Sequence, residues 1–192
     1  MDLFFVRDTS GDTASNLQLF SLIQAFKYWN EVNEMRSKSE TNSSKLLEYY
    51  VFIIACLGLS LTQLLGQNYS KGAKSIPNPG ELLADIFNQN KDFSKKRKKI
   101  INKRFDEFIS IYNKCRHFGI TKDRATHSIV AGITFDEVSK SLKTTLLIWD
   151  NIIAIFKKDP NNLLDDFEPH GIQSIVEDIL RNGSYEFRDK LV

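Results

Sequence analysis

Residues 134–156 read TFDEVSKSLKTTLLIWDNIIAIF, and this stretch decides the fold class. Thr134 followed three residues later by Glu137 is a capping box, in which each side chain satisfies the free backbone amide of the other. Behind this start, side chains suited to a packed seam recur at steps of three and four residues, namely Phe135, Val138, Leu142, Thr145, Trp149, Ile152 and Phe156. That spacing is typical of one face of an α-helix in a bundle. The pair Asp159-Pro160 closes the segment, so we predict a helix over 134–157.

The rest of the chain reads in the same way. Apolar residues at helical spacing, together with capping and breaking residues, predict further helices over residues 13–36, 44–67, 81–88, 93–118 and 171–181. The scarcity of proline and glycine, four and nine residues, favours long helices over short strands. We therefore expect an all-α protein, a bundle of five to six mostly antiparallel helices. The 192 residues suit a single domain, 1–192. Pro77 and Pro79 disfavour a helix in the connection 68–80, and no conformation is predicted for 119–133.

The most apolar stretch, residues 49–66, reads YYVFIIACLGLSLTQLLG and contains no charge. Its length is at the threshold for a membrane span. Ser60, Thr62 and Gln63 crowd its second half, and no second stretch of this kind exists in the sequence. We expect a central helix that its neighbours contact on all sides, and no membrane partner.

The two cysteines, Cys56 and Cys115, both fall inside apolar helical patterns. Two such cysteines do not indicate a disulfide framework, and they favour a reducing compartment. The first residues, MDLFFVRD, lack the basic start and the long apolar run of a secretory signal. We therefore expect a cytoplasmic protein.

Several classes of site fail on spacing. Residues 66–75 are like a phosphate-binding loop, but Ala73 stands where a glycine must precede the lysine, and a helix precedes the loop. Cys115, His117, His127 and His170 do not have the spacing of a zinc site. No nucleophile elbow and no Cys-x-x-Cys pattern is present. We expect no metal and no cofactor.

A basic segment stands out against the small net charge of +2, because residues 91–104 hold eight cations and one acid, Asp92. The run Ser94–Lys99 opens a predicted helix, where cations oppose the helix dipole. The candidate binding residues of this segment are Lys95, Lys96, Arg97, Lys98, Lys99 and Lys103. Three explanations stay open: a nucleic-acid phosphate backbone, an acidic protein partner, or solubility alone.

A second polar cluster lies at the other end of the same helix. Asn113, Arg116 and His117 are spaced to share one side of the helix, and Arg124 and His127 follow on the connection. Arginine as a bidentate donor and histidine as an acid or base could hold and cleave a phosphodiester. The alternative is a cation pair that satisfies the last carbonyls of the helix.

A helical bundle with Asn and Arg near a helix end and a histidine close by resembles the HEPN superfamily, over about residues 93–157. This resemblance implies either a metal-independent endoribonuclease, such as a toxin or defence effector, or a binding module without activity. The family motif is an arginine, four to six intervening residues and then a histidine, and the histidine positions that this spacing allows after Arg116 hold Thr121, Lys122 and Asp123. In an active protein, Arg116, His117 and His127 would be the catalytic residues.

The sequence thus predicts an interaction module that binds RNA or an acidic protein through its basic helix. A metal-independent ribonuclease is the alternative, and a structural subunit of a larger complex is a second one. Self-association stays open.

Overall fold

The computed structural model describes residues 17–38, 43–66, 79–91, 93–116, 132–157 and 171–182. These residues form six helices: α1 (Leu17–Ser37), α2 (Ser43–Gly66), α3 (Pro79–Gln89), α4 (Lys95–Arg116), α6 (Phe135–Phe156) and α7 (Gly171–Asn182). No strand occurs among them, so the all-α prediction is confirmed. Wherever both the predicted and the observed end of a helix are described, the two agree within two residues. The predicted helix residues 13–16, 67 and 117–118 lie outside the described ranges.

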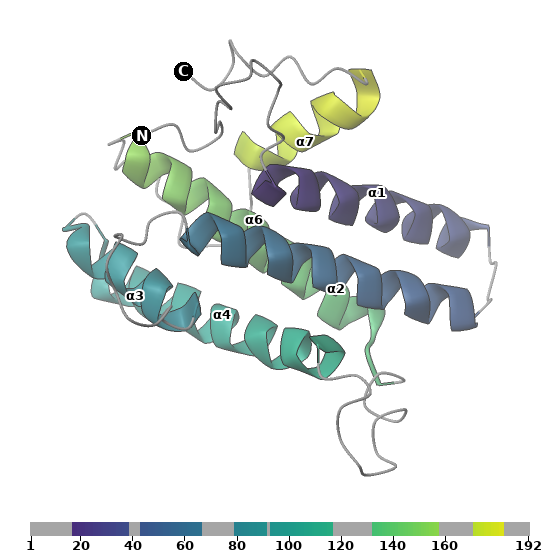
Figure 1. The fold of residues 1–192 in the computed structure, drawn as a ribbon, viewed down its shortest axis with the longest axis horizontal. Coiled ribbons are helices and arrows are strands. Elements are labelled where there is room, and N and C mark those ends of the chain that lie inside the picture. The colour runs from purple at the N-terminus through teal and green to yellow at the C-terminus, as the bar shows by residue number, and fades with distance from the viewer. Residues whose placement is uncertain are drawn as a thin grey trace, which may run out of the picture.

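The helices pack around α2 and α6, as Figure 1 shows. The two long helices α1 and α2 run antiparallel, side by side, and form the most extensive helix pair. On its other edge α2 packs against α4, and α6 lies behind them. The short helix α3 packs on α2 and α4, and α7 packs on α1 and α6.

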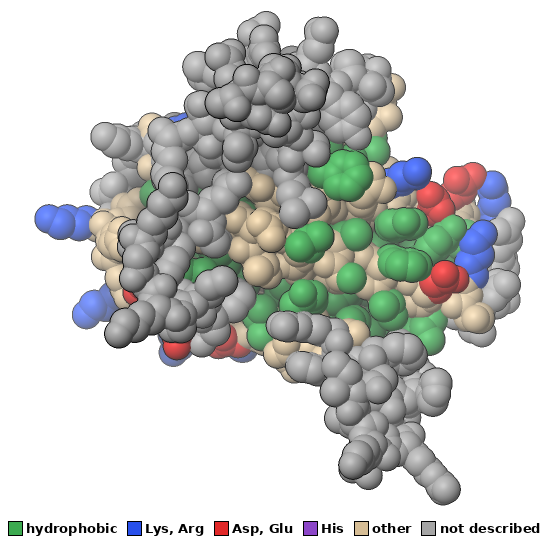
Figure 2. Space-filling view, viewed as in Figure 1, with side chains coloured by type: hydrophobic (Ala, Val, Ile, Leu, Met, Phe, Trp, Pro, Cys, Tyr) green, Lys and Arg blue, Asp and Glu red, His purple; other side chains and the backbone are tan. Residues whose placement is uncertain are grey.

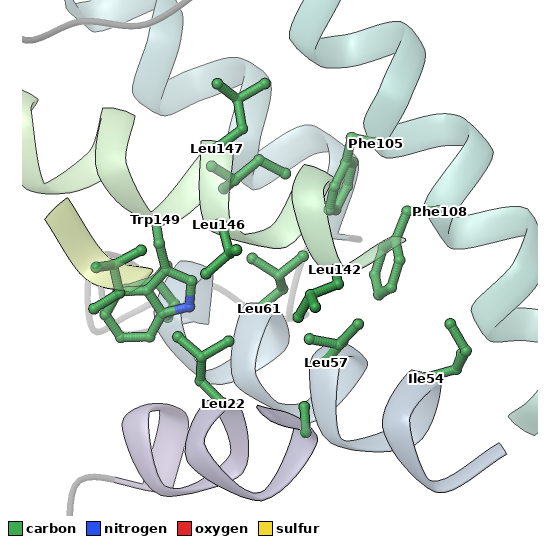
Figure 3. Close-up of a cluster of buried hydrophobic side chains, with 14 of the residues drawn as sticks. Leu22, Ile54, Leu57, Leu61, Phe105, Phe108, Leu142, Leu146, Leu147 and Trp149 are labelled. Atoms are coloured by element: carbon green, nitrogen blue, oxygen red, sulfur yellow. The ribbon is translucent and has the colours of Figure 1, made fainter. Parts of the chain in front are cut away.

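The core draws buried side chains from all six described helices. Figure 3 shows Leu57 and Leu61 of α2 against Phe105 and Phe108 of α4 and Leu142 of α6. The predicted α6 seam is buried at Val138, Leu142, Thr145, Trp149 and Ile152 and half-buried at Phe135, and the side chain of Phe156 lies outside the described residues. On α4, the apolar residues at helical spacing that predicted a helix over 93–118 are buried at Ile101, Phe105, Phe108 and Cys115 and half-buried at Ile109 and Tyr112. Burial of such a cluster is the main source of stability in a bundle.

Two buried hydrogen bonds tie α6 to its neighbours. The indole Nε1 of Trp149 donates to Ser60 Oγ of α2 at 3.0 Å. The backbone amide of Ile172, in the first turn of α7, donates to the Asp150 carboxylate at 2.8 Å. Both contacts fix the rotation of one helix against another, which apolar packing alone specifies less sharply.

The start of α6 has the predicted capping box. The backbone amide of Thr134 donates to Glu137 Oε2 at 2.8 Å, and the amide of Glu137 donates to Thr134 Oγ1 at 3.2 Å. A cap of this kind typically contributes about 1 kcal/mol to stability.

Two sequence predictions are wrong. Helix α3 begins at Pro79, inside the stretch where proline was expected to prevent a helix. Proline is well tolerated at the first helical position, where its missing amide costs no hydrogen bond. Helix α2 is also not contacted on all sides, because Phe52 and Leu59 are 44% and 39% exposed. The helices α1, α4 and α6 surround it only in part, and Figure 1 shows its front face without a covering helix among the labelled elements.

Within the described residues, one helix, Ser44–Leu65, is long and apolar enough to cross a membrane by length and composition, with a mean hydropathy of 1.5. Core helices of soluble proteins pass the same test. The expectation of no membrane partner stays a prediction, as do the cytoplasmic location and the single domain.

Candidate nucleic-acid interface

The basic segment is positioned by the hairpin of α3 and α4. Phe87 at the end of α3 stacks on Phe93 in the turn, with ring centroids 4.5 Å apart. Ser94 then caps α4, because its Oγ accepts a hydrogen bond from the backbone amide of Arg97 at 3.1 Å. The aromatic pair thus anchors the turn, and the cap fixes where the basic turns of α4 begin.

The six predicted cations divide into two groups. Lys95, Lys96, Lys99 and Lys103 are exposed, and we call these four side chains the basic surface. Arg97 and Lys98 are half-buried and turn back toward the hairpin. The guanidinium of Arg97 lies 5.9 Å from the centre of the Phe93 ring, and Lys98 Nζ donates to Asn88 Oδ1 of α3 at 3.4 Å. Lys98 thus contacts α3, and Arg97 contacts the turn between α3 and α4.

The basic surface is largely free of neutralising acids. Among the carboxylates that the structure describes, none lies within 4.0 Å of the amino groups of Lys95, Lys96 or Lys99. Lys103 approaches Glu107 at 4.0 Å, an exposed pair of the kind that contributes little. Beyond it the exposed side of α4 carries Asp106 and Glu107, so the basic surface covers only about 12 Å of helix.

The basic surface lies beyond one end of α2. A Cβ added to Gly58 of α2 would come within 2.1 Å of the Tyr112 ring of α4, so the two helices are in close contact there. Since α4 runs antiparallel to α2, its residues before 104 extend past Gly66, the end of α2. The basic surface therefore lies at the end of the bundle that α3 closes.

The predicted Arg/His site falls mostly outside the described residues. Asn113 is exposed on the last full turn of α4, and Arg116 is the final residue of that helix. The side chain of Arg116 and all of His117, Arg124 and His127 lie outside the described ranges, as do the loop 67–78 and His170. The catalytic role of Arg116, His117 and His127 stays a prediction.

Cys115 is a buried core thiol on the face of α4 opposite the solvent. Burial, together with the nearby Glu137 carboxylate, raises the pKa of this thiol to about 11. At neutral pH it is therefore protonated and a poor nucleophile. Within the described part of the chain, no three Cys, His, Asp or Glu side chains are close enough together to hold a metal ion.

A small pocket between the end of α1 and the start of α2 was not anticipated from the sequence. It has a volume of about 190 Å³ and is lined by Glu31, Glu34, Met35, Lys38, Lys45 and Tyr49. Its charges are already satisfied by one another: Lys38 pairs with Glu34 at 2.6 Å, and Lys45 lies 5.6 Å from the centre of the Tyr49 ring. A hydrogen bond to Glu31 raises the pKa of the Tyr49 hydroxyl. This internal pairing makes the pocket a weaker candidate than the basic surface.

Two residues that shape the basic surface were also missed. Ser94 could have been identified, because serine directly before a helical pattern is a typical cap. Asn88 could not, because nothing in its local sequence indicates that it accepts a hydrogen bond from Lys98, ten residues away.

Three comparisons with known proteins bear on identity. No family model matches the chain, and neither a curated protein nor a solved structure shows significant similarity to it.

Proposed function

We propose that this protein is an interaction module that binds the phosphate backbone of RNA through the basic surface at the start of α4. The observation that supports the proposal most is the exposure of Lys95, Lys96 and Lys99 on one helix start with no described carboxylate within 4.0 Å. The same proposal includes the resemblance of the protein to the HEPN superfamily and a cytoplasmic location, and both are supported by the sequence alone.

The position of these lysines has an energetic cost in the absence of a ligand. Each cation in the first turn of a helix opposes the helix dipole by about 0.3–1 kcal/mol at low ionic strength. A bound phosphate removes that cost, because it pairs with the lysines and also accepts from the free amides of the first turn. An anionic ligand is therefore stabilised by both the side chains and the backbone.

The surroundings of the basic surface favour RNA over an acidic protein. Stable protein interfaces have a largely apolar centre that anchors the partner. The large apolar side chains that are exposed in the described residues, Phe20, Phe52 and Leu59, lie on α1 and α2, and none lies on α3 or α4. Phosphate binding by counterion release needs no such anchor.

The test is charge reversal at Lys95, Lys96 and Lys99, all to Glu, with RNA affinity measured by fluorescence anisotropy. Lys98 is kept because its bond to Asn88 holds α3. We expect at least a tenfold loss of affinity at 50 mM salt. The matched control reverses three exposed lysines on α1 and α6, Lys27, Lys143 and Lys157, and should retain most of the affinity. Because acids suit a helix start, the first variant should unfold at the same or a higher temperature, which separates lost binding from lost folding.

Salt gives a second readout for the wild-type chain. If the four lysines of the basic surface contact about four phosphates of a single strand, affinity should fall about fiftyfold between 50 and 200 mM salt. The proposal would be contradicted by an RNA affinity that does not change with salt concentration. An equal loss of RNA affinity in the two triple variants would contradict it as well. Binding of acidic peptides in preference to RNA would favour the acidic partner. Cleavage of the RNA that chelator does not inhibit would favour the ribonuclease.

A further inference from the structure

The exposed side of α2 carries the spacing of a coiled-coil seam. From Lys45 onward its exposed side chains alternate in steps of three and four residues: Lys45, Glu48, Phe52, Ala55, Leu59 and Thr62. Steps of three and four residues define one face of any α-helix, and a second helix packed along this face would contact these side chains. The buried side of α2 is occupied separately, by Ile53, Ile54, Leu57, Leu61, Leu64 and Leu65.

This exposed side is apolar and lies open. No charged residue occurs between Glu48 and Gly66, and Phe52 and Leu59 are 44% and 39% exposed. Tyr28 of α1 extends the apolar surface, because its ring stacks on Phe52 with centroids 5.6 Å apart. In Figure 2 apolar side chains spread over this face of the molecule, where α1 and α2 lie in Figure 1.

We propose that α2 pairs through this face with α2 of a second copy of the chain, antiparallel, with the two-fold axis crossing the exposed side at the level of residue 57. Residues 52 and 62 lie at equal distances from residue 57, and so do residues 55 and 59. The axis therefore places Phe52 opposite Thr62 of the second copy, and Ala55 opposite Leu59 of the second copy. Each of the resulting four layers joins one large and one small side chain, which is how facing helices interdigitate without voids.

The charges at the rim agree with this register. Glu48 lies beyond the last layer, opposite Gly66 of the second α2, so it meets no like charge on the described helix, and Lys45 lies one turn further out. A parallel pairing would instead place Glu48 opposite Glu48, which costs stability. The mixed signs also fit a second copy better than a lipid surface, since helices that lie on membranes carry an excess of Lys and Arg along their polar face.

The area of the α1–α2 face sets an upper limit that falls within the range of specific interfaces, about 600–1,000 Å² on each partner. A helix of the length of α2 extends about 36 Å, and two packed helices are about 20 Å across, so the α1–α2 face offers about 700 Å². Specific interfaces bury about 800 Å² on each partner.

The first test is sedimentation of the full chain between 1 and 100 µM, in which we expect a species of twice the chain mass of 22.1 kDa. Phe52→Glu and Ala55→Glu should each weaken the pair at least tenfold, because each buries a carboxylate in the seam. Both sites are exposed in the single chain, so the circular dichroism of the monomer should persist. Lys143→Glu, at an exposed site on α6, is the matched control and should pair like the wild type.

Cross-linking tests the register. In a Cys56→Ser background, Ala55→Cys and Leu59→Cys chains are mixed and oxidised, and we expect the mixed disulfide to exceed either homodimer. A disulfide needs Cα atoms about 4.4–6.8 Å apart, which the proposed layer provides only for 55 against 59. Sedimentation at the monomer mass throughout, a pair that both glutamate variants leave intact, or an excess of homodimers would overturn the proposal. The proposal would also be overturned if the monomer bound lipid vesicles in a flotation assay and Phe52→Glu abolished that binding.

Discussion

The buried indole of Trp149 shows how a single polar contact orients a bundle. Its Nε1 donates to Ser60 Oγ, so the apolar surface of α6 has one favoured register on α2. Trp149 could be placed in the seam of its helix from the sequence, because its spacing from Thr145 and Ile152 is helical. Its partner could not, since Ser60 lies 89 positions away and a serine in an apolar helix has no pattern of its own.

We predict that Ser60→Ala destabilises the protein by about 1–3 kcal/mol, the cost of a buried donor without an acceptor. For a chain of this size that corresponds to a fall in the unfolding temperature of about 2–4 °C for each kcal/mol. Urea unfolding monitored by Trp fluorescence measures the change. Thr62→Ala, on the exposed side of the same helix, is the control and should cost less than about 1 kcal/mol, and equal losses at the two sites would contradict the explanation.

At the scale of single elements, one carboxylate caps the start of α7. Asp150 of α6 accepts the amide of Ile172 and is 8% exposed, so its negative charge lies at the positive end of the α7 dipole. The close approach also explains Gly171, where an added Cβ would lie 3.1 Å from Asp150 Oδ1. The helix itself was predictable from its apolar face, and the residue that docks it was not, because the contact joins two separate helices.

We predict that Asp150→Ala loosens α7 before it unfolds the bundle. Loss of a helix cap of this type costs about 0.5–2 kcal/mol, and it should accelerate hydrogen exchange at the amides of the first turn of α7. Asp150→Asn should be milder, because its amide oxygen still accepts the hydrogen bond. Uniform acceleration across α2 and α6 as well would show that the contact supports the whole core instead.

The wrong prediction for α2 has a physical origin at the same scale. Phe52 and Leu59 are exposed, whereas Ile53, Leu57 and Leu61 are buried, and the two sets are alike in hydrophobicity. When every side of a helix is apolar, its sequence does not indicate which side lacks a neighbour. The charged helix α4 is the opposite case, because its polar and apolar residues separate, and its buried side was predicted correctly.

At the scale of the whole molecule, the sequence predicted where the cations of the basic surface lie, but it did not predict which of them are exposed. The charge run identified the right turns of α4, since no tertiary contact is needed to place a block of cations at a helix start. The division into four exposed lysines and two half-buried cations depends on Asn88 of α3 and on Phe93 in the following turn, and it could not be predicted from the charge run.

The close contact of Gly58 with Tyr112 has a consequence for valency. It sets Tyr112 level with the proposed two-fold axis along the helix direction, and Lys99 lies about 20 Å away along α4 toward the end closed by α3. Two antiparallel copies would then hold their lysines about 40 Å apart, one set at each end. An RNA strand that reaches both sets should gain avidity of roughly 10²-fold or more, because its second contact forms at a high effective concentration. A shorter strand should bind wild type and Phe52→Glu equally, whereas the long strand should prefer the wild type. If wild type and Phe52→Glu bound the long strand equally as well, each copy would bind RNA independently, and the pair would hold no strand at two sites.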